Sequence, residues 1–221
     1  MAGLWDSRRM DVVYSDRLDA LEQTWRIWAD LGAELTERQW TAATRCPGWD
    51  VAAVYAHHST FPRDMDGPLP PLSGRPGVEP VTAVEMVRRF NAPGGVAHEA
   101  ADAVAKGAVS GAAEAGGGGL VERFAVRGPG AVRRLRAEEP ARTVPWGATG
   151  LTLELAEAVR IVLLEATVHL LDVQRALDRP PLVPPQALSD TALLLAEVAP
   201  PVDFIEAATG RSARSPLPVL R

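Results

Sequence analysis

Glu165 and His169 place a carboxylate and an imidazole four residues apart in the apolar stretch 163–171. Residues four apart on an α-helix lie one turn apart on the same face. Such a pair also stabilises exposed helices by simple charge pairing, but the surrounding leucines and valine favour a buried face. Because a buried, unpaired carboxylate is costly, it needs a compensating partner such as a divalent metal ion. One further ligand from another helix would complete the two-histidine, one-glutamate set typical of catalytic zinc.

His57 and His58 are the candidates for that third ligand. They lie in a second predicted helix over 51–61, for which Asp50 is the expected N-cap. His57 falls on the side of Val54, three residues before it, whereas His58 falls nearer to Val51. Helical periodicity therefore does not choose between the two histidines.

The remaining elements expected from the sequence are also helical. Apolar residues at three- and four-residue intervals predict helices over 16–33, from 82 to 115 with an interruption at 91–95, over 129–139, over 152–177 and over 186–199. Loops are expected at 62–80 and 145–150, and a flexible break at 116–119. Four main helices with one long crossover predict an all-α, antiparallel four-helix bundle over residues 1–180, followed by a small helical extension over 181–221.

Composition sets outer limits on the function. The chain has 221 residues, 47% of them hydrophobic, which is enough for a substantial core. The net charge of −5 argues against nucleic acid as the main partner. A single cysteine, Cys46, excludes an internal disulfide and favours a reducing compartment. The apolar segment 158–171 is too short and too charged to span a bilayer, and 1–16 lacks an apolar signal core. We therefore expect a soluble cytoplasmic protein with no membrane partner.

Two separated blocks resemble one family. The block Cys-Pro-Gly-Trp-Asp-Val-Ala-Ala-Val-Tyr-Ala-His at 46–57 and the block Glu-Ala-Thr-Val-His-Leu-Leu-Asp-Val-Gln-Arg-Ala-Leu at 165–177 are similar to the signatures of the mycothiol-dependent maleylpyruvate isomerases. These are the actinobacterial branch of the DinB-like metal-binding bundles. The C-terminal Thr209-Gly210-Arg211 is also similar to the tails of many members. Leu170-Leu171 stand where the family often has Gly-Trp, and His58 where an apolar residue is usual.

The resemblance implies a DinB-like fold with His57, Glu165 and His169 as ligands of a divalent metal, for which zinc is favoured. It also implies mycothiol, a low-molecular-weight thiol, as cosubstrate. Only a thiolate is nucleophilic, and a metal ion with an open position can deprotonate a bound thiol. The expected activity is therefore transfer of the thiol to an electrophilic small molecule, or isomerisation of that molecule, by a monomer or a homodimer.

Three further residues are candidates for roles in the reaction. Asp172 lies three residues beyond His169 and either orients that ligand or pairs with Arg175 on the helix surface. Arg211 either binds a carboxylate of the thiol or substrate or is a surface residue of the tail. His58 either acts as an acid–base group near the thiol or packs at the edge of the bundle.

Two other functions fit the same residues. A metal-dependent hydrolase would use the open metal position to activate water instead of a thiol. A non-catalytic protein would bind a metal or small molecule in the same fold, since a fold does not fix a function. A closed shell of four protein ligands, with His58 or Asp172 as the fourth, would favour the non-catalytic protein.

Overall fold

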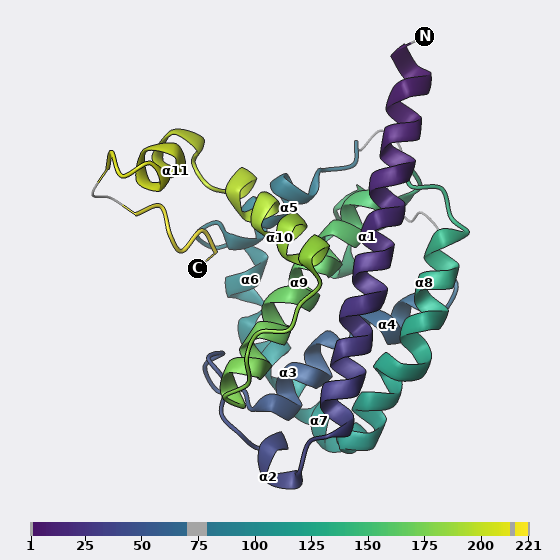
Figure 1. The fold of residues 1–221 in the computed structure, drawn as a ribbon, viewed down its shortest axis with the longest axis vertical. Coiled ribbons are helices and arrows are strands. Elements are labelled where there is room, and N and C mark those ends of the chain that lie inside the picture. Colours follow the sequence, from purple (N-terminus) through teal and green to yellow (C-terminus); the bar gives the residue numbers. More distant parts are fainter. Residues whose placement is uncertain (1, 70–78, 213–214, 221) are drawn as a thin grey trace.

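The computed structural model describes residues 2–69, 79–212 and 215–220, and within them the protein is an all-α, antiparallel four-helix bundle with a short C-terminal extension (Figure 1). The four bundle positions are filled by α1 (Ala2–Ala33), α3 (Val51–His58) continued by α4 (Thr60–Met65), α7 (Ala101–Glu122) continued by the π-helical η1 (Arg123–Arg127) and α8 (Gly128–Arg136), and α9 (Leu155–Ala176). The predicted fold class is confirmed.

The remaining elements connect or flank the bundle. They are α2 (Glu37–Trp40), α5 (Ala83–Asn91), α6 (Val96–Glu99), β1 (Thr143–Pro145), η2 (Gly147–Thr149), β2 (Thr152–Glu154), α10 (Pro185–Val198) and α11 (Pro201–Ala208). Helices α5 and α6 lie on the long crossover between α4 and α7, and part of the expected loop at 62–80 lies outside the described residues.

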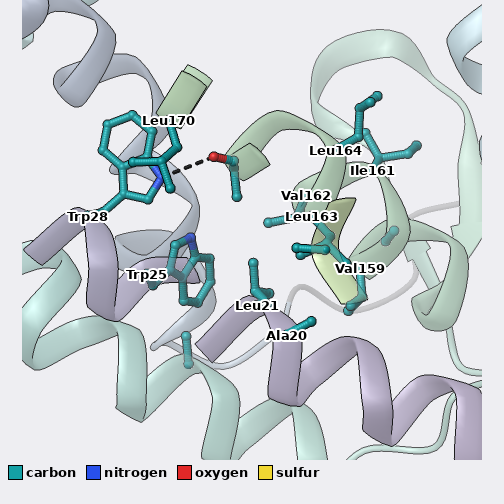
Figure 2. Packing of buried hydrophobic residues seen from close by; sticks show 14 of the residues in the cluster. Ala20, Leu21, Trp25, Trp28, Val159, Ile161, Val162, Leu163, Leu164 and Leu170 are labelled. Atoms are coloured by element: carbon teal, nitrogen blue, oxygen red, sulfur yellow. Dashed lines mark hydrogen bonds between the residues drawn. The ribbon is translucent and has the colours of Figure 1, made fainter. Parts of the chain in front are cut away.

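The core forms where α1 packs against α9, as Figure 2 shows for Leu21, Trp25 and Trp28 facing Val162 and Leu163. All five side chains are almost fully buried. The indole nitrogen of Trp28 donates to a main-chain carbonyl of α9, that of Ala166, at 3.1 Å. Since a buried indole N–H without a partner is unfavourable, this bond helps to fix how α1 lies on the helix that carries Glu165 and His169.

Helix α1 is longer than predicted, since it begins at Ala2 and not near Asp16. Tyr14 extends the buried stripe by one turn and is 5% exposed, and its hydroxyl donates to the carbonyl of Leu135 at 2.8 Å. The sequence stretch before Ser15 contains Ala, Leu, Met and Arg, all good helix formers, so the helix has no reason to start at Ser15.

The predicted break at 116–119 coincides with a kink in α7. The helical backbone is interrupted at Gly116, with φ 61° and ψ 167°, and helix continues directly after it. Gly117 has a packing role as well, because a β-carbon there would lie 2.8 Å from the indole nitrogen of Trp40. The glycines therefore allow a kink and a close helix contact.

A β-hairpin that the sequence did not predict precedes α9. Thr143, Val144 and Pro145 pair antiparallel with Glu154, Leu153 and Thr152. The residues expected to form a loop at 145–150 include the connection of this hairpin, and α9 begins at Leu155 and not at Thr152. Strands of three residues are too short to give a recognisable alternation.

The C-terminal extension packs back onto the bundle through α10, which contacts α1, α5 and α9. Arg17 on α1 donates to Asp190 on α10 at 3.3 Å, and Leu194 is fully buried. Helix α11, which was not predicted, stands away from the bundle, and the chain after it returns toward α5 (Figure 1). Among the helices of the described residues, none has the length and apolar character needed to cross a membrane.

Candidate metal centre

Glu165 and His169 lie on one face of α9, as their spacing predicted. The Nε2 atom of His169 is 3.3 Å from Oε2 of Glu165. The His169 side chain is 15% exposed and the Glu165 side chain 32% exposed, so both lie at the edge of the core, accessible from outside. Both side chains are therefore held in place by the core and are still accessible to a ligand.

His57 joins this pair from α3. The carboxylate of Asp50 accepts from the amide of Ala53 at 2.8 Å and so caps the start of α3 as expected. Two turns further along, Nε2 of His57 lies 3.7 Å from the same Oε2 of Glu165. One ligand atom from each of His57, Glu165 and His169 lies within 4.8 Å of the other two.

This arrangement fits a divalent metal ion. Ligand atoms about 2.0–2.1 Å from a tetrahedral zinc ion lie roughly 3.3–3.4 Å from each other. The separations of 3.3 and 3.7 Å from Glu165 to the two histidines are close to that value. Two imidazoles and a carboxylate are also donor types that zinc accepts. In the described part of the chain, no fourth side chain joins this group of three.

A tight turn before α3 packs its last residue against the two histidines. Pro47 and Gly48 occupy the central positions of the turn, with Gly48 at φ 78°, and the amide of Trp49 donates to the carbonyl of Cys46 at 3.0 Å. Proline followed by a glycine with positive φ is typical of a type II turn. The Trp49 ring then lies 5.0 Å from the ring of His57 and 6.2 Å from that of His169.

Asp172 holds the outer side of His169. Its Oδ2 lies 3.1 Å from Nδ1 of His169, and its Oδ1 accepts two bonds from Arg45, at 2.7 and 3.1 Å. The thiol of Cys46 donates to the same Oδ2 at 3.4 Å. A hydrogen bond between Nδ1 and a carboxylate fixes the ring with Nε2 on the side of Glu165, an arrangement common around metal-binding histidines. Asp172 therefore contacts both His169 and Arg45, and Arg45 is its ionic partner.

The carboxylates of the cluster are negatively charged. Burial alone would lower the pKa of His169, but its hydrogen bonds with Asp172 and Glu165 raise it well above the usual value, so a metal ion would replace a proton on that imidazole. Burial alone would raise the pKa of Glu165, but hydrogen bonds from His169 and His57 hold it well below its usual range. Burial alone would likewise raise the pKa of Asp172, but the hydrogen bonds of His169 and Arg45 lower it. Both carboxylates are thus ionised near neutral pH.

Cys46, His169 and Asp172 form a second group of potential ligand atoms. In this group, Asp172 already accepts from Cys46, from His169 and from the guanidinium of Arg45. A cation placed there would face the positive charge of Arg45, so the group of His57, Glu165 and His169 is the better metal centre.

His58 points into the core and not toward the cluster. It is fully buried, and its Nε2 accepts from the indole nitrogen of Trp25 at 3.0 Å. The rings of Trp28, Phe61 and Phe124 lie 5.2–5.7 Å away. A group without exposed surface cannot meet a thiol that enters from solvent, so we give His58 no part in the chemistry proposed below.

Arg211 lies beyond α11, and its Nη1 donates to the carbonyl of Thr209, two residues before it, at 3.4 Å. It is exposed, and it lines neither of the cavities beside the metal centre. Its expected role as a carboxylate-binding group remains a prediction from the sequence.

Two cavities meet at the metal centre. The smaller, of about 180 Å³, is lined by His57 and Glu165, and the larger, of about 470 Å³, by His57 and His169. Phe90 on α5 contributes to both. A third depression, of about 630 Å³, contains Cys46 and Trp49 but none of the three candidate ligands. Molecules in the first two cavities would thus reach the cluster from different sides.

The sequence reasoning did not assign roles to Arg45, Cys46 and Trp49 at this site. Arg45 is 127 residues from its partner Asp172, so only the folded turn brings the two together. The one available signal was the Cys-Pro-Gly-Trp segment, whose turn chemistry indicates a fixed conformation but not what it contacts.

The fold and the site together define an all-α bundle with a candidate metal centre, in which two histidines and a glutamate lie between two cavities. The chain belongs to the family described as Mycothiol maleylpyruvate isomerase N-terminal domain, whose model matches residues 21–174. The match begins within α1, ends within α9 and includes His57, Glu165, His169 and Asp172, and with the structure it confirms the DinB-like fold. No curated protein and no solved structure matches the chain.

Proposed function

We propose that this protein is a metal-dependent enzyme that uses mycothiol to attack an electrophilic small molecule, with His57, Glu165 and His169 holding one divalent metal ion, for which zinc is favoured. The observation that carries the proposal is the cluster of these three side chains, with spacing close to that of zinc ligands, between two cavities. Membership of the family supports mycothiol as the thiol.

The metal ion would supply activation of the thiol. A free thiol has a pKa of about 8.5, and a bound divalent cation lowers it so that the nucleophilic thiolate predominates near neutral pH.

The protein's own residues supply position. Asp172 holds Nδ1 of His169 and so directs Nε2 toward Glu165, while Arg45 neutralises the charge of Asp172. Trp49 covers one side of the two imidazoles and limits the access of water. A thiol and an electrophile held on two sides of one centre react with the advantage of proximity.

The outcome of the attack depends on the electrophile. If the sulfur adds to a conjugated double bond and then leaves again, the double bond can change its geometry, which is isomerisation. If the adduct persists, the product is a thioether. If a leaving group departs, the thiol replaces it. The first reaction is that of an isomerase and the other two are those of an S-transferase.

The proposal is tested by measuring the metal and its ligands. We expect elemental mass spectrometry of the tag-free protein to find one divalent metal per chain, and X-ray absorption to show a sulfur ligand only after mycothiol is added. A metal without a sulfur ligand in the presence of mycothiol would contradict thiol activation and favour a hydrolase or a binding protein. A chain that takes up no metal after reconstitution would overturn the metal centre itself.

A further inference from the structure

The smaller cavity at the candidate metal centre has a mostly apolar lining. Its lining consists of three aromatic side chains and five aliphatic or thioether side chains, with His57, Asn91 and Glu165 as the polar members. The aromatic members are Phe61, Phe90 and Trp146. None of the lining residues in the described part of the chain is a lysine or an arginine.

The described arginines of α5 and α9 beside this cavity are engaged elsewhere. On α5, Arg88 donates to the carbonyls of Val198 and Glu197, at 3.1 and 2.6 Å, and Arg89 pairs with Glu85. On α9, the guanidinium of Arg160 donates to Glu197 at 2.7 Å. These arginines of α5 and α9 therefore bind partners away from the cavity.

The apolar lining itself disfavours an anion. A carboxylate of a substrate placed among Phe61, Met86 and Leu164 would lose its hydration without gaining a cationic partner from the lining, and such burial is costly. A neutral apolar group would instead gain from leaving water.

The volumes assign the two cavities to different molecules. A cavity of about 150 Å³ lined by apolar side chains holds a benzene molecule, so the 180 Å³ cavity suits one ring with a short chain. Pockets for larger ligands measure about 300–1,000 Å³, a range that includes the 470 Å³ cavity beside His169. The larger cavity therefore suits the bulkier thiol and the smaller one the electrophile.

We infer that the electrophile is a small, uncharged, apolar molecule, such as an aryl-substituted enone, which enters the cavity formed by Phe61, Phe90 and Trp146. That the bound molecule is an electrophile rests on the proposed function. The preference of the cavity for a neutral, apolar molecule does not. With an enone, the thiol sulfur bonds to the β-carbon, the π bond breaks, and the thiol proton ends on the α-carbon, so no oxidant or reductant is needed.

The test measures binding without any thiol. The probes are 4-phenylbutan-2-one, which is neutral and unreactive, and its para-carboxylate, which has the same skeleton with a negative charge. Isothermal titration calorimetry on the whole chain should give at least about tenfold tighter binding for the neutral ketone, because the carboxylate loses its hydration on entering the cavity. Equal or tighter binding of the carboxylate would overturn the inference.

A variant at the edge of the cavity shows whether the probe binds there. Leu220 lines the cavity, whereas Leu217 does not and is 60% exposed. Leu220→Arg should bring the affinities of the two probes together by strengthening carboxylate binding about tenfold, and Leu217→Arg should leave both unchanged. If Leu220→Arg has no effect, the ketone binds elsewhere and the inference fails.

The two proposals fail in different experiments. A chain that shows the metal-dependent sulfur signal but binds neither probe keeps the proposed function and overturns the assignment of the small cavity. A chain that prefers the neutral ketone but shows no sulfur ligand with mycothiol keeps a neutral-ligand cavity, and overturns the conclusion that its occupant is an electrophile.

Discussion

His57 and His58 are neighbours in the sequence but occupy opposite environments. His57 lies beside a carboxylate at the meeting point of two cavities, and its side chain is 25% exposed. His58 has no exposed surface, accepts from Trp25 and is surrounded by aromatic rings. Because consecutive residues point about 100° apart around a helix, one turn of α3 contributes both to the candidate metal centre and to the core. Neighbouring residues of the same type can thus carry function and stability separately.

The strongest test of this contrast removes each proposed ligand in turn. We expect His57→Ala and His169→Ala each to lower metal affinity about 100-fold or more while the bundle stays folded, because the centre loses one of three ligands at its edge. Elemental mass spectrometry after dialysis and circular dichroism measure the two effects. His98→Ala, at an exposed histidine on α6, is the control. Full metal content in both ligand variants would refute the site.

His58→Ala should show the opposite pattern. Removing a fully buried ring leaves a cavity and deprives the Trp25 indole of its acceptor, so we expect the free energy of unfolding to fall by about 2–4 kcal/mol. Metal content at a temperature where the variant is folded should equal that of the unmodified chain. Urea denaturation gives the first quantity. A loss of metal without a loss of stability would place His58 in the centre after all.

Asp172→Asn tests whether orientation of His169 matters. An amide can still occupy the space, but it brings no charge to hold Nδ1–H, and loss of such a partner lowers metal affinity by about 10–100-fold. Competition with a chelator measures this change. Arg175→Ala is the matched control, since Arg175 is exposed on the same helix. Because the two substitutions change the net charge in opposite directions, affinity changes of equal size and opposite sign would mean that only the general charge of this surface matters.

The smallest expected effect is a dependence of stability on pH. Burial lowers the pKa of His58 well below its ordinary value, so the folded chain keeps it neutral while the unfolded chain protonates it near pH 6.5. This histidine therefore costs stability only as the pH falls below about 6.5, by about 1 kcal/mol at pH 5.5. His58→Phe should remove that contribution. The check is the difference in unfolding free energy between pH 7.5 and 5.5 for the two proteins, and an unchanged difference would contradict it.

The sequence predicted what depends on local geometry. The positions of Glu165 and His169 on one helix face follow from helical periodicity, and the cap at Asp50 from its hydrogen-bonding side chain. The choice between His57 and His58 does not follow from periodicity, because the two differ only in which neighbouring helix they face. The resemblance indicated His57, and the structure brings it next to Glu165.

Features that depend on distant contacts were not predictable in the same way. The bond between Arg45 and Asp172 requires the turn before α3 to dock on α9, and the hairpin before α9 has strands of three residues without a readable pattern. In both cases tertiary packing decides the outcome. The early start of α1 is different, because the helix formers before Ser15 already favour it, and the hydroxyl of Tyr14 then donates to the carbonyl of Leu135 on α8.

Because Trp49 lies beside the candidate metal centre, its fluorescence can report on binding there. Its ring lies 5.0 Å from His57 and 6.2 Å from His169, close enough for its emission to respond to whatever the two imidazoles bind. The chain has five other tryptophans, so the signal is the difference between the spectra of the unmodified protein and Trp49→Phe. Filling and emptying of the centre can then be followed in real time, without a label and without knowing the substrate.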